Sequence, residues 1–422
     1  MAQRGIREFY GKRMLAKYLP EYLGGSFGYE GEIALVDEKT NWDTLAKENP
    51  WLNKKPLVAK PDQLFGKRGK HGLLLIDKNL DEVRKWIGER MNKETKVGKI
   101  TDSLTHFIIE PLVKHEEEYY LAIKSNVTGD TIYFSTKGGM DIESVWDTVS
   151  EIDVPASTDI ETIDVAAKLP AELDDKKKKL VSKYIKGLYK YYADLHFAYL
   201  EINPFAMSGD NIFPLDMVAR LDDTALYECV EKWGETDFPP PFGRVMSKEE
   251  AYIKGLDEKT GASLKLTLIN PEGRIWTLVA GGGASVIYAD TIADLGKAEE
   301  IANYGEYSGD PNKEMTYEYT KTLLDLMTRT KHPKGKVLLI GGGIANFTDI
   351  AKTFTGIIQA LNDYKDKLKE NNVKIYVRRG GPNYKEGLRL MRELGETLGV
   401  PIEVYGPETH MTKIVSLGLE EN

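Results

Sequence analysis

The stretch Gly335-Lys336-Val337-Leu338-Leu339-Ile340-Gly341-Gly342-Gly343 decides the fold of the C-terminal half of this 422-residue chain. Its apolar part, residues 337–340, is short enough for a buried strand, and the glycines that follow predict a tight turn. A helix is expected to begin near Thr348, because apolar side chains then recur at helical spacing at Ile350, Phe354, Ile357, Leu361, Tyr364 and Leu368.

The same alternation continues towards the C-terminus. Residues 373–377 predict the next strand, which leads into Arg378-Arg379-Gly380-Gly381. A second helix carries Leu388, Met391, Leu394 and Leu398 on one face, and residues 401–405 predict a further strand. Strands that alternate with helices form a parallel sheet with right-handed crossovers, and such sheets bind ligands at the carboxyl ends of their strands.

The N-terminal half is separated from this region by Phe238-Pro239-Pro240-Pro241-Phe242-Gly243. Its prolines cannot donate backbone hydrogen bonds, so they interrupt helix and strand alike. We therefore expect one domain over residues 1–240 and a second over residues 247–422. Within the first domain, residues 174–195 predict an amphipathic helix.

Composition excludes several classes of protein. The formal net charge is −9, which argues against binding to nucleic acid or to an anionic membrane. No segment reaches the roughly 20 apolar residues that span a bilayer. Cys229 is the only cysteine, which excludes an internal disulfide framework and a cysteine-cluster metal site. A reduced, cytoplasmic protein is expected.

Glycine-rich turns follow three apolar runs, at residues 281–283, 341–343 and 380–381. Such turns let the backbone approach an anion at a helix N-terminus, although each alone is equally consistent with a tight connection. Asn346 or Thr348 suits a helix N-cap or a carboxylate contact, and Arg378-Arg379 suits a solvated pair or a bidentate carboxylate contact. Together these loops indicate a site for a small polycarboxylate.

The N-terminal half carries a second pattern. Lys60 ends an apolar run and precedes the basic glycine loop of residues 67–70, and Glu110-Pro111 ends another run. Asn203 and Asp216 follow two further runs, and their oxygens suit Mg²⁺. This order of a lysine strand, a Glu-Pro hinge strand and an Asn/Asp pair matches the nucleotide site of ATP-grasp proteins. The histidines, His71, His106, His115, His196, His332 and His410, are interpreted as structural or surface residues, and Cys229 as a buried small residue.

Taken together, these segments resemble the nucleotide- and citrate-binding part of ATP-citrate lyase, which is related to the beta subunit of succinyl-CoA synthetase. The resemblance extends from Arg7 to Leu417. Its most specific stretches are residues 60–64, 199–204, 238–244, 261–268, 273–285, 302–309, 344–348 and 377–384. It implies an α/β fold, with an ATP-grasp domain followed by a flavodoxin-like parallel-sheet domain.

The resemblance also implies roles for individual residues. For ATP these are Lys60 and Arg68 at the phosphates, Glu110, Pro111 and Val113 at the adenine through their backbone, and Glu118 at the ribose. Asn203 and Asp216 would hold Mg²⁺. Citrate would be bound by Ser308, Gly309, Gly343, Asn346, Phe347, Thr348 and Arg379, with only the backbone of Gly343 available where animal members carry a serine. Gly281, Gly282, Gly283, Ala284 and Ser285 would begin a helix whose positive end faces a phosphohistidine.

The family reaction uses ATP to activate citrate through a phosphohistidine and citryl phosphate, and CoA then displaces the phosphate. The histidine and the main CoA site belong to an alpha-like part of these enzymes. The resemblance therefore implies a partner subunit that carries both, in a hetero-oligomer that yields acetyl-CoA and oxaloacetate.

Three alternatives remain at this point. The large subunit of citryl-CoA synthetase would share nearly all these features and stop at citryl-CoA. A succinyl-CoA synthetase beta subunit fits less well, because Arg379 and its neighbours suit a larger, more charged acid. A non-catalytic sensor would need a dead ATP site, whereas Lys60, Asn203 and Asp216 are all present.

Overall fold

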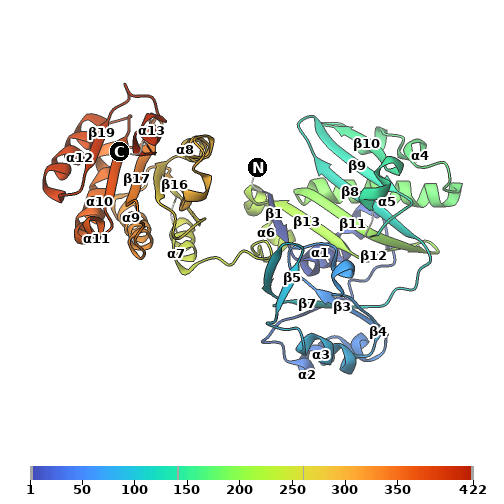
Figure 1. Ribbon diagram of the computed structural model, residues 1–422. Helices are drawn as coiled ribbons and strands as arrows, with labels where there is room; N and C mark the ends of the chain where they lie inside the picture. The colour runs from blue at the N-terminus through green and yellow to red at the C-terminus, as the bar shows by residue number, and fades with distance from the viewer. Residues whose placement is uncertain (1–2, 140–141, 260, 420–422) are drawn as a thin grey trace. The chain divides into compact units, whose positions relative to one another are not determined.

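The computed structural model describes residues 3–139, 142–259 and 261–419. Contacts between residues divide the chain into two compact units, Met1–Val245 and Met246–Asn422. Figure 1 labels the helices and strands of each unit.

The first unit is built around a large antiparallel sheet, with strands in the order β1-β13-β11-β8-β9-β10 and with β12 paired to β11. The strands are Gln3–Ile6 (β1), Glu118–Ser125 (β8), Gly129–Ser135 (β9), Ser150–Pro155 (β10), Phe197–Ser208 (β11), Asn211–Pro214 (β12) and Met217–Asp222 (β13). Helices α1 (Glu8–Leu23) and α5 (Asp175–Asp194) bury Leu19 and Leu188 in one apolar cluster with Leu200 of β11. The predicted helix over residues 174–195 is thus confirmed, and Asp174 caps it by accepting a hydrogen bond from the Lys177 amide.

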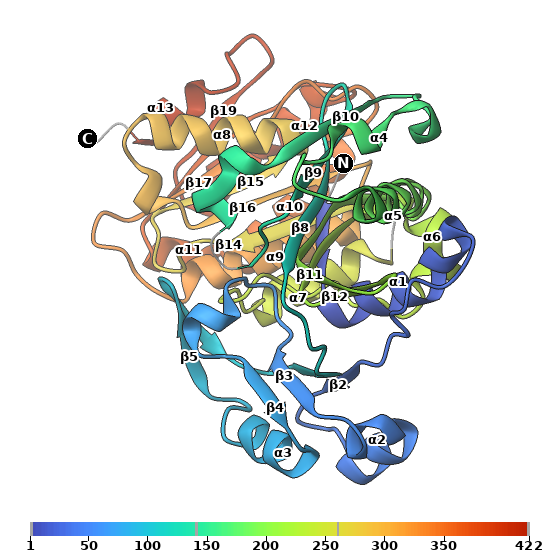
Figure 2. The same ribbon diagram turned by 90° about the vertical axis from the view of Figure 1, so that its right-hand side faces the viewer.

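A smaller antiparallel sheet completes this unit, in the order β2-β7-β3-β4. Its strands are Ala34–Val36 (β2), Leu57–Pro61 (β3), Leu75–Lys78 (β4) and Phe107–Pro111 (β7). Helices α2 (Trp42–Glu48) and α3 (Leu80–Gly88) lie beside it, as Figure 2 shows. Val83 and Ile87 of α3 pack with Leu57 and Phe107 of the sheet. The other elements are β5 (Glu94–Val97), β6 (Ile100–Ser103), α4 (Val165–Lys168) and α6 (Leu226–Trp233).

The second unit contains the predicted parallel sheet, in the order β14-β16-β15-β17-β18-β19. Its strands are Ser263–Leu268 (β14), Ile275–Ala280 (β15), Asn303–Ser308 (β16), Lys336–Gly342 (β17), Val373–Arg378 (β18) and Ile402–Tyr405 (β19). The edge strand β14 runs antiparallel to β16, and the other pairs are parallel. Counted from β15, the parallel strands follow the flavodoxin order 2-1-3-4-5, so the sheet has a switch point between β15 and β17.

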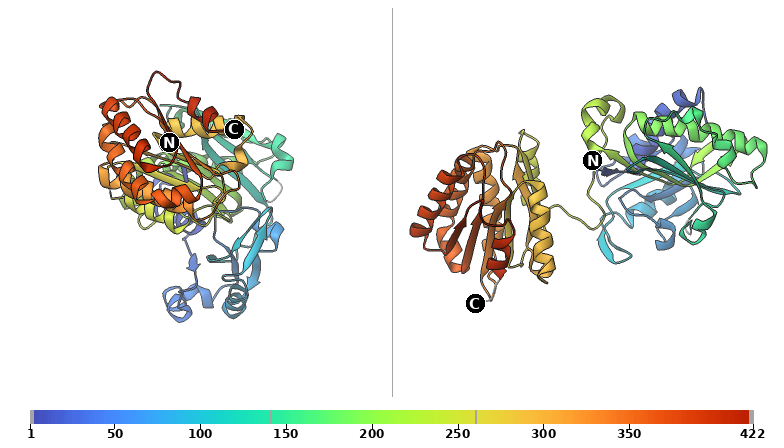
Figure 3. Two further views of the ribbon diagram at one scale, coloured as in Figure 1. Left: turned by 60° about the vertical axis from the view of Figure 1, so that its left-hand side comes forward. Right: turned by 90° about the horizontal axis from the view of Figure 1, so that it is seen from above.

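Helices cover both faces of this sheet (Figure 3). Leu338 and Ile340 of β17 pack against helices α9, α10 and α12, whereas Val337 and Leu339 pack against α8 and α13. The helices are α7 (Lys248–Asp257), α8 (Gly282–Asp294), α9 (Lys313–Thr328), α10 (Ile350–Asp363), α11 (Lys365–Glu370), α12 (Tyr384–Leu398) and α13 (Lys413–Leu419). This burial on both faces explains why residues 337–340 are uniformly apolar.

The helix predicted to begin near Thr348 is confirmed, but its N-cap is neither Asn346 nor Thr348. Helix α10 begins at Ile350, and its N-cap is Asp349, whose side chain accepts a hydrogen bond from the Lys352 amide at 3.0 Å. The loop between β17 and α10 therefore extends to Asp349, and it is hydrogen-bonded to the loop after β18. The Ala345 amide donates to Gly380 O at 2.9 Å, and the Ile350 amide donates to Pro382 O at 3.0 Å.

Candidate functional site

A cavity of about 970 Å³ lies in the first unit. This volume suits a ligand the size of a nucleotide. All the residues predicted for the nucleotide and the metal line it: Lys60, Arg68, Glu110, Pro111, Val113, Glu118, Asn203 and Asp216. The fold thus brings together side chains from strands of both sheets and from the loops between their strands.

Lys60 and Arg68 form the cationic end of the cavity. Lys60, near the end of β3, places its Nζ atom 2.7 Å from Leu215 O and 3.4 Å from Asp216 Oδ1. The Arg68 guanidinium also pairs with Asp216 Oδ1, and both cationic side chains are buried. Burial lowers the pKa of Lys60, but Asp216 and Glu8 raise it by more, so the net shift is upward. Both groups are therefore charged at neutral pH, as phosphate binding requires.

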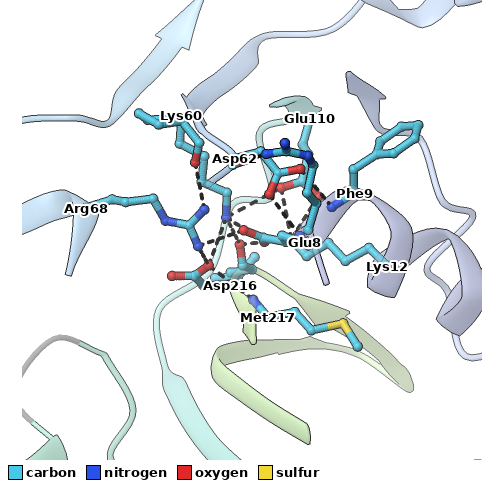
Figure 4. Close-up of polar contacts among 12 residues, drawn as sticks. Glu8, Phe9, Lys12, Lys60, Asp62, Arg68, Glu110, Asp216 and Met217 are labelled. Carbon is cyan, nitrogen blue, oxygen red and sulfur yellow. Dashed lines mark hydrogen bonds and ion pairs between the residues drawn. The ribbon is translucent and has the colours of Figure 1, made fainter. Parts of the chain in front are cut away.

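Two members of this end were missed in the sequence, namely Glu8 and Lys12 of α1. Glu8 Oε1 lies 2.8 Å from the Nζ atoms of Lys12 and Lys60, and Glu8 Oε2 lies 2.7 Å from Arg68 Nη2 (Figure 4). Lys12 Nζ also donates to both carboxylate oxygens of Glu110 at 2.9 Å. Burial raises the pKa of Glu8, but the three cations lower it by more, which leaves that pKa well below its usual range. The signal in the sequence was an i,i+4 charged pair on the apolar face of an amphipathic helix.

Asp62 fixes the start of α1 to this end of the cavity. The residue at the N-cap position, Arg7, makes no side-chain cap. Instead the carboxylate of Asp62 accepts hydrogen bonds from the amides of Glu8 and Phe9, at 2.8 and 3.1 Å. Burial, together with the nearby Glu8 charge, raises the pKa of Asp62 to about 6. The Lys60-Pro61-Asp62 stretch therefore supplies both a cation for the cavity and a cap for the helix that carries Glu8.

The cavity lining also combines apolar and polar groups away from the cluster of charges. Leu74, Ile76 and Val218 are partly exposed and line it. His115 also lines it, which sequence reasoning missed. One of its ring nitrogens lies 2.8 Å from Val113 O and the other 3.1 Å from Glu118 Oε1, so it joins two of the residues predicted for the nucleotide. Its position four residues after the hinge strand β7 was the available signal.

Oxygen donors suited to Mg²⁺ also line the cavity. Asn203, Asp216 and Glu201 line the cavity, and the side chain of Asp216 is 30% exposed. Asn203 Oδ1 accepts a hydrogen bond from the Gly139 amide at 2.7 Å, which fixes its orientation. Amide and carboxylate oxygens together with substrate phosphates form the usual Mg²⁺ environment, so these residues fit that ion. Over residues 3–139, 142–259 and 261–419 no group of three His, Cys, Asp or Glu side chains is placed to hold a metal alone.

In the second unit, the loops predicted for citrate all follow the carboxyl ends of parallel strands. Ser308 ends β16 and Gly309 follows it, the loop from Gly343 to Thr348 follows β17, and Arg379 follows β18. The predicted helix start after β15 is confirmed, since Gly281 is the N-cap of α8. These loops therefore flank the switch point of the sheet, where ligands bind in folds of this kind. Ser308 and Thr348 are half-buried, whereas Gly309, Asn346 and Phe347 are exposed.

The two adjacent arginines have different environments. Arg378 donates to three backbone carbonyls, those of Thr409, Gly342 and Pro407, so its guanidinium serves the packing of the loops. Arg379 is also buried and donates through Nη1 to Gly343 O at 2.6 Å, but its Nε has no hydrogen-bond partner. An unpaired buried donor is costly, so the Nε of Arg379 is suited to a ligand carboxylate.

The glycines at residues 341–343 serve packing more than the sequence indicated. A Cβ atom at Gly341 would lie 2.4 Å from the Tyr288 ring, and one at Gly342 would lie 2.7 Å from Arg379 Nη1. A Cβ at Gly343 would meet nothing within 4 Å. Two of these glycines are thus required by close contacts within the fold, and Gly343 alone faces open space.

Helix α8 starts from the glycine turn of residues 281–283. Gly281 has a φ of 99°, a backbone conformation that residues with a side chain rarely adopt. Its amide donates a hydrogen bond to Tyr307 O. The Ser285 hydroxyl lies 2.6 Å from Gly305 O and donates to it, so this side chain ties α8 to β16. Gly282, Gly283 and Ala284 then form the first turn of the helix.

Comparison with known protein families covers both units. Residues 2–233 match the ATP-citrate synthase ATP-grasp domain, and residues 244–421 match the ATP citrate lyase citrate-binding domain. The chain belongs to the ATP-citrate synthase family. The predicted ATP-grasp fold of the first unit is thereby confirmed, and so is the resemblance found in the sequence.

Relatives in this family are similar over the whole chain. ATP-citrate synthase of Bos taurus is 50% identical over 99% of this chain, which spans only 38% of the bovine protein. ATP-citrate synthase alpha chain protein 2 of Oryza sativa is 48% identical, and the match covers 100% of this chain and 99% of the rice protein.

Solved structures of archaeal ATP citrate lyase are more similar still. The enzyme from Methanothrix soehngenii in complex with citrate and coenzyme A is 59% identical with a TM-score of 0.89, and the match covers 100% of both chains. The enzyme from Methanosaeta concilii in complex with (3S)-citryl-CoA is 58% identical with the same TM-score, again over the whole of both chains. Within the described ranges, no helix of this chain is long and apolar enough to cross a membrane.

Proposed function

We propose that this chain is the ATP- and citrate-binding subunit of an ATP-citrate lyase. The observation that carries the proposal is the cavity of the first unit, which gathers every residue predicted for ATP and Mg²⁺. The archaeal relatives, solved with citrate and coenzyme A or with citryl-CoA, support the choice of acid and thiol. The proposed domains are residues 1–240 for ATP and residues 247–422 for citrate, and the proposed location is the cytoplasm.

In the first unit, Lys60 and Arg68 hold the phosphates of ATP. The adenine lies against the backbone of Glu110, Pro111 and Val113, and Glu118 contacts the ribose. Asn203 and Asp216 hold Mg²⁺, which neutralises charge on the phosphates when it is bound.

In the second unit, citrate is bound by side-chain and backbone donors. The Arg379 guanidinium pairs with one carboxylate through its unpaired Nε. Other contacts come from Ser308, Gly309 and the loop Gly343, Asn346, Phe347 and Thr348. Residues Gly281 to Ser285 direct the N-terminus of α8 at a phosphohistidine, because backbone N–H groups and the helix dipole favour an anion there.

The reaction needs a second chain. A carboxylate is a poor acylating agent, so the γ-phosphate passes to a histidine of a partner subunit and then to citrate, which gives citryl phosphate. CoA, bound mainly by the partner, displaces the phosphate to form citryl-CoA, and cleavage yields acetyl-CoA and oxaloacetate. The name alpha chain of the rice relative is consistent with such a division between subunits.

The test is reconstitution. We expect this chain to bind Mg-ATP and citrate alone, and to release acetyl-CoA and oxaloacetate only with the protein that co-purifies with it. Turnover of citrate, ATP and CoA by the isolated chain would contradict the need for a partner. Accumulation of citryl-CoA without cleavage would instead identify a citryl-CoA synthetase large subunit. Absence of Mg-ATP binding by calorimetry would remove the enzyme interpretation.

A further inference from the structure

Two carboxylates share the cations Lys60 and Arg68, but they differ in exposure. The side chain of Glu8 is 2% exposed, whereas that of Asp216 is 30% exposed and lines the cavity. Glu8 is held from behind by Lys12, whose side chain is fully buried. A carboxylate enclosed in this way cannot turn towards a ligand, whereas Asp216 can.

The charges of this cluster balance when no ligand is bound. The cluster consists of the six side chains that ion pairs join around the end of the cavity, which Figure 4 draws together with the neighbouring carboxylate of Asp62: Lys12, Lys60, Arg68, Glu8, Glu110 and Asp216. Three positive charges therefore face three negative charges. When Asp216 turns to a bound cation, the remaining five groups carry one net positive charge beside the phosphates.

We infer that Glu8 is a positioning residue. Its enclosed carboxylate keeps Lys60 and Arg68 side by side, so that Asp216 can leave these two cations and bind Mg²⁺ instead. The inference rests on the proposed binding of Mg-ATP in this cavity. Glu8 acts through the two cations and is not placed against the nucleotide. Lys12 keeps the carboxylate in place and, through Glu110, links it to the hinge strand β7.

The physical reason is the competition for Asp216. Lys60 and Arg68 repel each other, and each needs a counter-charge when buried. Without Glu8, Asp216 is the only one of these two carboxylates left to pair with both cations. It is then held by them and is less available to Mg²⁺. Loss of the Glu8 charge should leave the attraction between the cations and phosphate intact, because it removes a negative charge near an anion.

The experiment compares the wild-type chain with Glu8→Gln, which keeps the size of the side chain and removes its charge. Equilibrium binding is measured for adenosine, for ATP with EDTA and for ATP with Mg²⁺. The quantity of interest is the Mg²⁺ gain, the ratio of the ATP dissociation constants without and with Mg²⁺. Glu21→Gln is the matched control, because it is the same substitution at an exposed position of the same helix.

We expect the Mg²⁺ gain to fall on the order of tenfold in Glu8→Gln, because the contact between the Asp216 carboxylate and Mg²⁺ is lost. Adenosine binding and ATP binding with EDTA should stay within about twofold of wild type or tighten. An unchanged Mg²⁺ gain in folded Glu8→Gln would overturn the inference. A parallel loss of adenosine and ATP binding would also overturn it, because that result indicates a merely structural role.

A second variant covers the case in which Glu8→Gln does not fold. Glu8→Asp keeps the charge but withdraws it from Lys60 and Arg68 by one methylene. We expect it to fold with a reduced Mg²⁺ gain, and a wild-type gain in this variant would contradict a positioning role. Failure of the proposed function is distinguishable, because a wild-type chain that binds no ATP or shows no Mg²⁺ gain fails before any variant is compared.

Discussion

Replacement of Arg379 tests the proposed citrate site most directly. The informative change is Arg379→Met, which keeps much of the side-chain length and removes the guanidinium. Arg379 donates to Gly343 O and leaves its Nε unpaired in a buried position. The substitution therefore removes a donor that has no other use in the fold, together with one hydrogen bond to the loop after β17.

The magnitude follows from these contacts. A guanidinium that binds a carboxylate through two hydrogen bonds loses roughly 1.5 kcal/mol or more for each bond, which is about 3 kcal/mol in total. This corresponds to a citrate dissociation constant raised on the order of 100-fold. Arg379→Lys keeps the charge but not the planar fork, so its loss should be about half in free energy, or on the order of tenfold.

The assay is isothermal titration of citrate into the purified chain, with Mg-ATP titration of the same sample as an internal control. ATP binding should be unchanged, because its cavity is lined by residues of the first unit. Lys374→Met is a matched control, because Lys374 is an exposed residue of β18, the strand that Arg379 directly follows. Thermal melting of each variant reports any loss of fold.

Titration of succinate into the same variants adds a second comparison to this test. It has fewer carboxylates than citrate, so Arg379→Met should weaken citrate binding more than succinate binding. The reasoning is refuted if folded Arg379→Met binds citrate within about twofold of wild type. Equal losses for the two acids would show that Arg379 does not distinguish them, and tighter binding of succinate than citrate by the wild type would favour a succinyl-CoA synthetase beta subunit.

Three further changes have defined expectations. Lys60→Met should weaken ATP binding by about 2 kcal/mol, on the order of 30-fold, and leave citrate binding unchanged; calorimetry that found normal ATP affinity would remove Lys60 from the phosphate site. Asp62→Asn tests the raised pKa of about 6 at a buried carboxyl. Because the folded pKa lies above the unfolded value of about 3.9, the folded state binds more protons, and this contribution to stability falls by about 2 kcal/mol as the pH rises from 4 to 6. Chemical unfolding of wild type and variant across this range should show a difference with that slope, and a constant difference would contradict the raised pKa. Gly342→Ala should destabilise the fold by about 1–3 kcal/mol and weaken citrate binding, because its Cβ would lie 2.7 Å from Arg379 Nη1. Gly255→Ala, where a Cβ meets nothing within 4 Å, should melt at or above the wild-type temperature, and equal melting of the two variants would refute the contact.

The parallel sheet was predictable because its signals are local. Residues 337–340 are apolar on both faces, and the helices on either side have regular spacing, so order along the chain implied the layers. The order of Lys60, Glu110, Asn203 and Asp216 along the chain predicted a common cavity through its match to the ATP-grasp pattern. Lys60 and Glu110 lie near the ends of β3 and β7, but Asn203 lies within β11 and Asp216 lies between β12 and β13, so strand ends alone did not bring them together.

The contacts of Glu8 and Lys12 were not predictable in this way. Lys12 meets Glu110, and Glu8 meets Lys60, over long separations in the sequence, and no local pattern encodes such pairs. In the sequence both residues look like ordinary charges of an amphipathic helix. Only the packing of α1 shows that they face inward.

The start of α10 and the glycines before it show a different limit. Asn346 and Thr348 are plausible caps by residue type, but Asp349 is the cap because hydrogen bonds to the loop after β18 determine where the helix can begin. Likewise Gly341 and Gly342 are small because Tyr288 and Arg379 come close to them. The N-cap at Asp349 and the glycines at 341 and 342 therefore depend on residues that are close in space but distant in the sequence, so the local sequence does not predict them.

The division of the chain at Val245 and Met246 has a consequence for how such a protein can change over generations. The nucleotide cavity draws its lining from one side of this division, and the loops after β16, β17 and β18 lie on the other. Substitutions in the loops proposed for citrate need not alter the residues that line the nucleotide cavity. Because the two sets of residues do not overlap, mutation can change one set while the other stays the same.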